Sequence, residues 1–399
     1  MSRVVVTGMG IITAIGNGVS QNYDALISRR HGVGPITILE TIHRSDLPAA
    51  EIKLTNEKLA ALSSIIDYEL QTRTTLLGLI AAREAFEMGI GRYGQKHPDG
   101  NVLISSTTVG GMDKTEHYFY NYLESSEMSH LVPTHDCSES TGRIADALGL
   151  RHDNITLSTA CSSSLNAIML GAKLIKHGLA KRVIAGGTDA LTRFTLNGFN
   201  TLMILDKGHC RPMDASRTGL NLGEGAAYIV MESEESAKSA NKEIFCKIAG
   251  YANANDAYHQ TASSPDGYGP YLAMKEALDM SGLKPEQISY VNAHGTGTDN
   301  NDLTEGLAIE RIFGEKVPPV SSTKPYTGHT LAAAGVVETV FSILAIQQQV
   351  IFPNLNFRQK IEELSFKPVT DVVSAEVKHV VTNSFGFGGN DSSLVISKF

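Results

Sequence analysis

The sequence predicts an α/β protein made of two related halves. Strand-like and helix-like segments alternate along most of the 399-residue chain, which is typical of α/β folds with mostly parallel sheets. This length suits two linked units, or one large α/β unit, better than one small domain. The 37 glycines predict many tight turns, and the apolar fraction of 42% is that of an ordinary globular core.

The first half, residues 1–240, alternates between strand and helix patterns. Its opening apolar run predicts a buried strand that leads into a glycine turn. Its last strand passes into a charged, helix-prone stretch, which places the boundary between the halves near residue 240. The expected elements are a strand at 4–10, a helix at 74–90, a strand at 101–111, a helix at 158–178, a strand at 182–190 and a strand-to-helix segment at 223–242.

The second half, residues 241–399, repeats this rhythm and ends in two strands around a glycine loop. Gly282 closes an amphipathic helix, because glycine is the preferred residue just after a helix. The two halves therefore look related. The expected elements are a strand at 243–256, a helix at 269–282, a strand at 288–298, a helix at 328–346 and a strand pair at 379–399.

Composition narrows the class of protein. The formal net charge of −8 argues against nucleic acid as a partner. The sequence has no uninterrupted apolar run of about 18 residues, so no membrane span is expected. Early glycines in the N-terminal segment fit a strand better than a signal peptide, which predicts a cytoplasmic protein. Cys137, Cys161, Cys210 and Cys246 lie far apart, which predicts free thiols and no metal site.

Cys161 is the first candidate for chemistry, because it stands in STACSSSL just before a predicted helix. Most lone cysteines are inert core residues. A helix N-terminus is worth roughly 0.3–1 kcal/mol, which lowers a thiol pKa by less than one unit. Cys161 therefore needs a basic partner if it is to act as a nucleophile.

Two histidines of the second half are candidates for that partner. His294 follows a predicted strand in NAHGTGT, and His329 precedes a predicted helix in KPYTGHTLAAAG. Each alone is more often structural, but α/β proteins place function at such junctions. Neutral imidazoles there can donate hydrogen bonds to a developing oxyanion, and each such donor is worth on the order of 3 kcal/mol.

The segment NSFGFGGN near the C-terminus predicts a loop that contacts a ligand. Gly386, Gly388 and Gly389 allow the backbone to approach a ligand closely. A tight β-turn is the simpler explanation, but Phe385 and Phe387 alternate with these glycines, and mobile aromatic side chains can gate a pocket.

Lys324 and Glu338 are separated by one helical stretch, and we expect them to form an ion pair that orients His329.

Other catalytic sequence patterns are incomplete or absent. TGMGIIT has Thr13 where a dinucleotide-binding fingerprint needs its third glycine, so it is interpreted as a first-strand turn. No serine-hydrolase elbow, HExxH or Walker pattern is present in the sequence.

Seven ordered motifs, spread over nearly the whole chain, resemble those of the β-ketoacyl-acyl-carrier-protein synthases, the elongating ketosynthases of the thiolase superfamily. They are VVVTGMGIIT, STACSSSLNAI, RVIAGGTDA, RPMDASRTGLNLGEGAAYIVMES, NAHGTGTDNND, KPYTGHTLAAAGVVE and NSFGFGGND. The resemblance implies a thiolase-like, layered α-β-α-β-α architecture. It places the nucleophile in residues 1–240 and the two histidines in residues 241–399.

The resemblance also implies roles for single residues. Cys161 accepts an acyl group from the phosphopantetheine arm of an acyl-carrier protein, with no bound cofactor. His294 and His329 stabilise the enolate formed when malonyl-carrier protein loses its carboxylate. The backbone amides of Cys161 and Phe387 form the oxyanion hole, and Phe387 gates the pocket. The remaining implied residues are Thr296 and Thr298 on the pantetheine arm, Phe385, Gly386 and Gly388 at the substrate, and Lys324 with Glu338 as the supporting ion pair.

The family implies a homodimer, or a heterodimer with a related ketosynthase-like subunit, and Lys207 and Arg211 are candidate carrier-protein contacts. Three departures from common fatty-acid elongation enzymes leave both fatty-acid and specialised polyketide or polyene biosynthesis open: a short 202–214 segment, SSSL after Cys161, and a polar segment at 134–142. Two alternatives stay open. A non-catalytic chain-length partner would lack the nucleophile, and a thiolase-type acyltransferase would carry a second catalytic cysteine.

Overall fold

The computed structural model describes residues 3–65, 67–92, 100–125, 129–150 and 154–399. An 11-stranded sheet with the order β4-β3-β5-β6-β1-β7-β13-β12-β8-β9 forms the centre, and β2 pairs with β1 outside this path. The strands of this sheet are β1 (Val4–Thr13), β2 (Gly16–Asn17), β3 (Asn101–Ser106), β4 (Ile155–Leu157), β5 (Arg182–Asp189), β6 (Gly225–Ser233), β7 (Cys246–Asn255), β8 (Tyr290–Asn292), β9 (Val320–Ser321), β12 (His379–Gly386) and β13 (Asn390–Ser397). A second small sheet pairs β10 (Val350–Ile351) with β11 (Val373–Ser374).

Helices cover both faces of this sheet. They are α1 (Val19–Ile27), α2 (Asn56–Ser63), α3 (Arg73–Gly89), α4 (Met112–Ser125), α5 (Cys137–Ala147), α6 (Ser163–Lys176), α7 (Arg193–Thr201), α8 (Glu234–Ser239), α9 (Tyr268–Ser281), α10 (Asp299–Phe313), α11 (Lys324–Thr327) and α12 (Ala334–Gln348). Four 3-10 helices complete the described elements: η1 (Tyr68–Leu70), η2 (Ser129–His135), η3 (Pro285–Gln287) and η4 (Leu331–Ala333).

The strand order repeats in mirror fashion about the middle of the sheet. Read from one edge, the strands of the first half run β4-β3-β5-β6-β1; read from the other edge, those of the second half run β9-β8-β12-β13-β7. If the five main strands of each half are numbered by their order along the chain, leaving out β2, β10 and β11, both halves have the same arrangement. From the edge to the middle of the sheet it is third, second, fourth, fifth, first. The two halves meet where Val4–Val6 of β1 pair with Cys246–Ile248 of β7. The boundary at residue 240 falls between α8 and β7 and stays a prediction.

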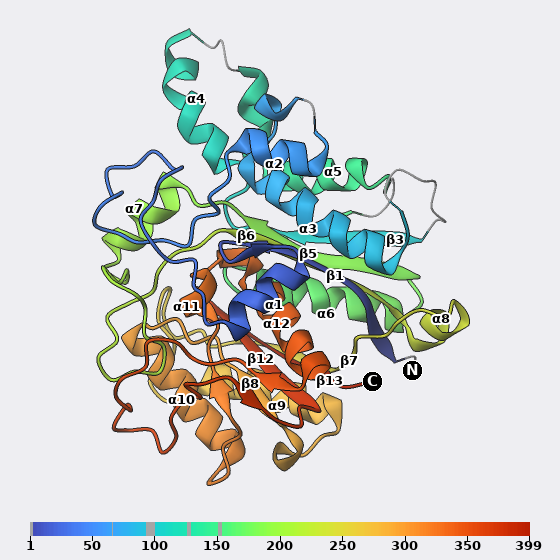
Figure 1. The fold of residues 1–399 in the computed structure, drawn as a ribbon, viewed down its shortest axis with the longest axis vertical. Coiled ribbons are helices and arrows are strands. Elements are labelled where there is room, and N and C mark those ends of the chain that lie inside the picture. Colours follow the sequence, from blue (N-terminus) through green and yellow to red (C-terminus); the bar gives the residue numbers. More distant parts are fainter. Residues whose placement is uncertain (1–2, 66, 93–99, 126–128, 151–153) are drawn as a thin grey trace.

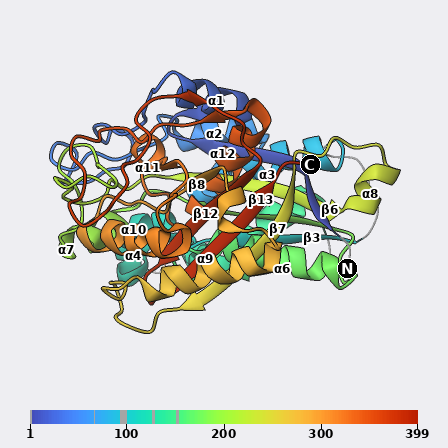
Figure 2. The ribbon, with the colours of Figure 1, turned by 90° about the horizontal axis from the view of Figure 1, so that it is seen from below.

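The expected α-β-α-β-α layering is present (Figure 1). Helix α3 covers the outer face of the first half of the sheet, and α9 covers that of the second half. Figure 2 shows α9 and α10 beside each other on this outer face. Helices α6 and α12 form the central layer, since they contact each other and strands of both halves. The start of each central helix therefore lies where the two halves meet.

The prediction of mostly parallel sheets was wrong. The pairs β3–β4, β3–β5, β8–β9 and β8–β12 are parallel. The pairs β5–β6, β6–β1, β1–β7, β7–β13 and β13–β12 are antiparallel. A tight loop joins β12 directly to β13, and such a connection can only produce an antiparallel pair. The alternation of strand and helix segments in the sequence does not distinguish parallel from antiparallel pairing.

The glycines of the first motif lie inside a strand and do not form the predicted turn. A Cβ on Gly8 would lie 2.5 Å from the Ala85 carbonyl oxygen, and one on Gly10 would lie 2.1 Å from that of Ala81. Both carbonyls belong to α3, which crosses β1 closely. The glycines therefore make room for a helix while β1 continues to Thr13.

Within the part of the chain that the structure describes, one stretch, Leu331–Gln348, is long and apolar enough to cross a membrane by length and composition. In the fold, 89% of this stretch is buried. It comprises η4 and α12, which pack between strands of both halves. Its apolar character is that of the central core helix.

Candidate active site

Cys161 lies in a sharp turn between β4 and α6, and not inside the helix predicted over 158–178. Helix α6 begins only at Ser163. Ala160 adopts a left-handed conformation with φ of 52°, which is unfavourable for a residue with a Cβ. The hydroxyl of Ser163 holds the turn by donating to the Ala160 carbonyl (2.5 Å) and accepting from the Thr159 amide (2.8 Å). The strained turn presents the Cys161 side chain at the start of a central helix.

His329 is the direct partner of Cys161. Its Nε2 lies 3.0 Å from the Cys161 Sγ, and both residues are buried. Burial raises the pKa of the Cys161 thiol to about 11, although the charge of Lys324 and the Phe387 backbone amide oppose the rise. Burial and then the Lys324 charge lower the pKa of His329 well below its ordinary value. Both shifts favour a resting pair of neutral thiol and neutral imidazole.

His294 faces His329 and is held by the ion pair of Lys324 and Glu338. The two imidazole centroids lie 5.3 Å apart at 83°. Lys324 Nζ donates to the His294 Nδ1 at 3.2 Å and forms a short ion pair with Glu338. The predicted ion pair is therefore present, but the expectation that it orients His329 was wrong, because its contact is with His294. Donation from Lys324 assigns the His294 proton to Nε2.

The loop between β12 and β13 closes the site from the other side. The Phe387 backbone amide reaches the Cys161 sulfur, as its effect on the thiol pKa indicates. Ser384 Oγ donates to the Cys161 carbonyl at 2.8 Å, which ties the end of β12, just before the loop, to the cysteine turn. The Phe387 ring stacks on Phe199 of α7, with centroids 5.7 Å apart and an interplanar angle of 19°.

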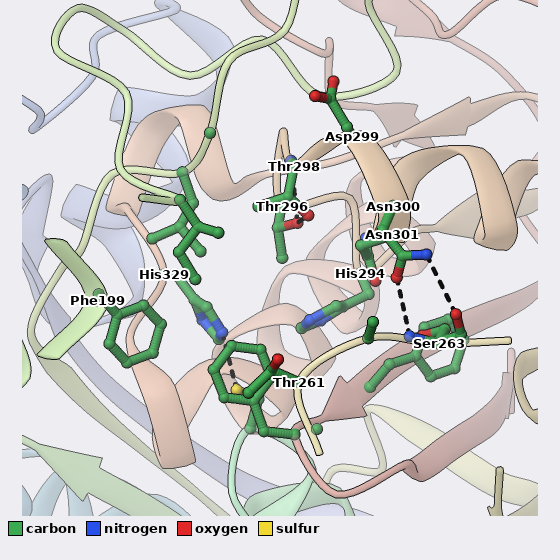
Figure 3. Close-up of a pocket in the computed structure, with 18 of the residues that line it drawn as sticks. Phe199, Thr261, Ser263, His294, Thr296, Thr298, Asp299, Asn300, Asn301 and His329 are labelled. Carbon is green, nitrogen blue, oxygen red and sulfur yellow. Dashed lines mark hydrogen bonds between the residues drawn. The ribbon is translucent and has the colours of Figure 1, made fainter. Parts of the chain in front are cut away.

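These groups meet at a pocket of about 270 Å³ (Figure 3). His294 and His329 point toward each other at its base, and Thr296, Thr298 and Asn300 lie farther out. The lining combines apolar side chains, among them Phe199, Leu220, Phe385 and Phe387, with several hydroxyl and amide side chains. Asn300 joins the start of α10 to the 261–263 loop, because its side-chain amide exchanges hydrogen bonds with the backbone of Ser263.

Two protein-family models match the chain. The one for "Beta-ketoacyl synthase, N-terminal domain" matches residues 1–237, and the one for "Beta-ketoacyl synthase, C-terminal domain" matches residues 245–358. The chain belongs to the β-ketoacyl synthase family. It is thus an acyltransferase of the elongating ketosynthase type, within the thiolase superfamily. The sequence resemblance is confirmed.

Relatives of the ketosynthase match it over almost its whole length. The "3-oxoacyl-[acyl-carrier-protein] synthase 2" of Coxiella burnetii (strain RSA 493 / Nine Mile phase I) is 35% identical over 99% of this chain and 98% of its own. The enzyme of that name from Staphylococcus aureus (strain COL) is 33% identical over 100% of this chain and 98% of its own. A solved structure, "The ishigamide ketosynthase/chain length factor", is 29% identical with a TM-score of 0.92, covering 100% and 99% of the two chains.

The substrate-side residues predicted for the ketosynthase are only partly at the pocket. Thr296 and Thr298 line it, and their hydroxyls lie 2.9 Å apart. Phe385 and Gly386 also line it. Gly388 does not; its amide donates instead to the Gln260 carbonyl at 2.7 Å. The neighbouring Gly389 takes its place at the pocket wall.

The two candidate carrier contacts, Lys207 and Arg211, lie outside the pocket lining. Lys207 is exposed. Arg211 uses its guanidinium within the fold, because it donates to the Ser216 carbonyl and the Thr218 hydroxyl and lies 3.5 Å from Asp206. Its charge is therefore neutralised by the loop that carries it.

Sequence reasoning missed several pocket residues of the ketosynthase. Phe199, Met203 and Ile204 come from α7 and the residues after it, and the 261–263 loop comes from the second half. Nothing in their local sequence marks them, because their approach to Cys161 depends on how distant segments pack.

Among the described residues, no cluster of three or more histidine, cysteine or acidic side chains could hold a metal ion.

Proposed function

We propose that this ketosynthase loads an acyl chain onto Cys161 and extends it by decarboxylative condensation with malonyl-acyl-carrier protein. The observation that carries the proposal is the contact of 3.0 Å between Cys161 Sγ and His329 Nε2, with His294 facing the same pocket. A complete Cys–His–His set favours catalysis over the non-catalytic chain-length role. A second thiol at the pocket, which a thiolase-type reaction needs, is not among its described lining residues.

In the first half-reaction, Cys161 attacks the thioester carbonyl of the acyl-carrier protein. The sulfur–acyl bond forms as the bond to the pantetheine sulfur breaks, and the thiol proton passes through His329 to the leaving thiolate. His329 is suited to accept that proton because it rests neutral beside a neutral thiol. The amides of Cys161 and Phe387 would stabilise the tetrahedral oxyanion.

In the second half-reaction, malonyl-carrier protein occupies the emptied pocket and loses carbon dioxide. The electron pair of the broken carbon–carbon bond moves into an enolate, whose oxygen accepts a hydrogen bond from Nε2–H of His294 and a second one from His329 in the tautomer that carries its proton on Nε2. The carbanion then attacks the Cys161 thioester, and the cysteine thiolate leaves and takes up a proton supplied by solvent. The product is a 3-oxoacyl chain two carbons longer. The polar outer part of the pocket, with Thr296 and Thr298, fits the amides of a pantetheine arm.

We further propose a cytoplasmic enzyme whose partners are an acyl-carrier protein and a second subunit, without nucleic acid or a membrane. The second subunit is either another copy or a related ketosynthase-like chain. The pathway, fatty-acid or polyketide/polyene, follows from which acyl chains Cys161 accepts. Preferential use of polyunsaturated chains would support the polyene pathway, and equal or better use of saturated chains would reject it.

The decisive experiment is intact-protein mass spectrometry after incubation with acyl-carrier protein and then malonyl-carrier protein. We expect an acyl adduct on Cys161 that disappears as the 3-oxoacyl product forms. Cys161→Ala should show no adduct, whereas Cys137→Ser, a change at a more exposed cysteine, should show the wild-type adduct. No adduct with any acyl donor would reject catalysis and favour a partner-subunit role.

A further inference from the structure

A closed ring of side-chain hydrogen bonds joins the two halves of the chain beside the cysteine turn. Its members are Asn166 of α6, Asn253 of β7, and Asn390 and Ser392 of β13, and we name these four residues the amide ring. Asn253 Nδ2 donates to Ser392 Oγ at 2.9 Å, and Ser392 Oγ donates to Asn166 Oδ1 at 3.1 Å. Asn166 Nδ2 and Asn253 Nδ2 both donate to Asn390 Oδ1, at 2.9 and 2.7 Å. Every donor in the ring meets an acceptor, so the amide groups are held in one orientation.

The amide ring is also bonded to the residues on both sides of the nucleophile. Ser162, which directly follows Cys161 and is fully buried, donates from its hydroxyl to Asn390 Oδ1 at 2.6 Å. Asn166 Nδ2 donates to Thr159 Oγ1 at 2.8 Å, on the other side of the turn. Asn390 Oδ1 thus accepts from three side chains, and two of them belong to the cysteine turn or to the helix that follows it. The position of Asn390 is therefore tied to that of the nucleophile.

Asn390 forms one side of the base of the hairpin that carries Phe387. It pairs across the ladder with Gly386, which leaves residues 387–389 as the loop. Gly386 lies directly against the cysteine turn, because a Cβ there would be 3.3 Å from the Cys161 amide nitrogen. The loop itself ends in two glycines with φ of 86° and 77°, and glycine backbone is permissive. The base of the hairpin, more than the loop, therefore determines where the Phe387 amide lies.

We propose that Asn390 is a positioning residue for the oxyanion hole: it holds the Phe387 amide in register with the Cys161 amide. This inference rests on the proposed function, in which those two amides stabilise the tetrahedral oxyanion. Such donors act only if they already stand about 2.7–3.1 Å from the place where the oxyanion will form. The amide ring consists of amides and a hydroxyl. It therefore fixes the loop without adding a negative charge that would oppose the oxyanion.

The steps of the reaction depend differently on this hole. Attack of Cys161 on the donor thioester, and attack of the carbanion on the acylated Cys161, both pass through a tetrahedral oxyanion. Loss of carbon dioxide instead gives an enolate, which His294 and His329 stabilise. A displaced Phe387 amide should therefore slow acylation and carbon–carbon bond formation more than decarboxylation. An enolate that finds no acyl partner takes up a proton from solvent and leaves as acetyl-carrier protein.

Asn390→Leu tests the proposal, because leucine has nearly the same shape and no accepting oxygen. Removing an oxyanion donor costs roughly 10²–10³-fold, and displacing one should cost less, so we expect about tenfold slower acylation of Cys161 by mass spectrometry. In a second assay, the enzyme is first fully acylated by long incubation and freed of donor, and malonyl-carrier protein is then added. Carbon dioxide release should stay within about twofold of wild type. The 3-oxoacyl product formed per carbon dioxide should fall, and acetyl-carrier protein should appear.

Asn255→Leu is the matched control. Asn255 Nδ2 donates to the Gly388 carbonyl at 3.3 Å, so this residue contacts the same loop from outside the amide ring. Acylation and the product ratio should therefore stay within about twofold of wild type in this variant. A loss equal to that of Asn390→Leu would show that any change at the loop has this effect, and it would overturn the proposal.

Asn166→Leu breaks the amide ring from the side of the cysteine turn and should give the same separation of acylation from decarboxylation. If Asn166 and Asn390 act through one contact, their effects are not additive. The double variant should then acylate no more slowly than the slower single variant. Losses that multiply would mean that the two residues act independently, which would contradict the positioning role.

The outcomes keep this proposal apart from the proposed function. No adduct on wild-type Cys161 from any acyl donor would reject the proposed function itself. Acylation of the wild type, with an unchanged rate and product ratio in Asn390→Leu, would reject the positioning role alone. Parallel loss of acylation and carbon dioxide release in both single variants, with lowered melting temperatures, would mean that the amide ring acts in folding, and this too would overturn the proposal.

Discussion

At the scale of the residue, Lys324 decides which ring nitrogen of His294 carries the proton. Its ammonium donates to Nδ1 of His294, so the proton of that ring faces the pocket on Nε2. The same charge lies near His329 and disfavours a second positive charge there. One buried cation therefore keeps both imidazoles neutral and fixes the orientation of one of them.

Replacing this cation should affect decarboxylation more than acylation. We expect Lys324→Met to lower carbon dioxide release from malonyl-carrier protein by about 10²-fold, the usual loss for a displaced oxyanion donor, and to lower Cys161 acylation less. The change also leaves Glu338 buried without its partner, which costs about 3–5 kcal/mol of stability. Adding Glu338→Gln should restore much of the melting temperature without restoring decarboxylation; full recovery of both would show that Lys324 acts only in folding.

The pH dependence of cysteine alkylation follows from the thiol pKa. Burial raises this pKa to about 11, so Cys161 should be protonated throughout the neutral range. Its alkylation by iodoacetamide should therefore rise about tenfold per pH unit between pH 7 and 9, in proportion to the thiolate. Cys161→Ala provides the background from the other thiols. A plateau from pH 6 upward would instead indicate a resting thiolate–imidazolium pair.

At the scale of the element, β1 packs very closely against α3 where the two cross. Gly8 and Gly10 bring the strand against helix backbone, where there is no flexible side chain to move aside. This contact fixes α3 on the outer face of the first half of the sheet. The opposite face of the sheet is thereby left for α6, the helix that follows Cys161.

A methyl group at this crossing should destabilise the fold. We expect Gly10→Ala to cost about 1–3 kcal/mol, the usual effect of overpacking, because the new Cβ would lie 2.1 Å from the Ala81 carbonyl oxygen. Gly34→Ala is the control, since no atom lies within 4 Å of its Cβ position. Thermal unfolding of the two variants measures the difference; equal melting temperatures would mean that α3 can shift at no cost.

Local patterns predicted most elements but not how they pair. The helix expected at 269–282 matches α9, and the strand at 182–190 matches β5, because hydrophobic periodicity is local. The glycines of β1 were misassigned to a turn, since a glycine needed for close approach looks the same in sequence as one needed for a turn. Cys161 and the two histidines stood out in compact motifs, whereas Phe199 reaches Phe387 only through tertiary packing.

At the scale of the whole molecule, the candidate site is shared between the halves. The first half supplies Cys161, and the second supplies His294, His329 and the Phe387 loop. The first half also exposes an aromatic face on α4 and its neighbours, where Tyr120 and Leu123 are 73% and 63% exposed. Further apolar residues of that face are Phe119, Tyr122 and Val132.

This aromatic face is where we expect a second copy of the chain to bind. Purified protein should have twice the monomer mass by light scattering, and Leu123→Asp should shift it toward the monomer, because an interface of this kind is held by its apolar core. Ile42→Asp should leave the mass unchanged. A monomeric wild type that associates only with a related ketosynthase-like chain would establish a heterodimer instead.

The position of β1 also bears on how the chain is made. This strand precedes the other described strands in the chain, yet apart from the short β2 its partners are β6 and β7, at Gly225–Ser233 and Cys246–Ile248. The strand is apolar and fully buried in the folded protein. During synthesis it therefore stays without its partner strands until residues 225–233 have left the ribosome. Pairing over such long separations is slow. The nascent chain is therefore expected to depend on chaperones until the second half begins to emerge.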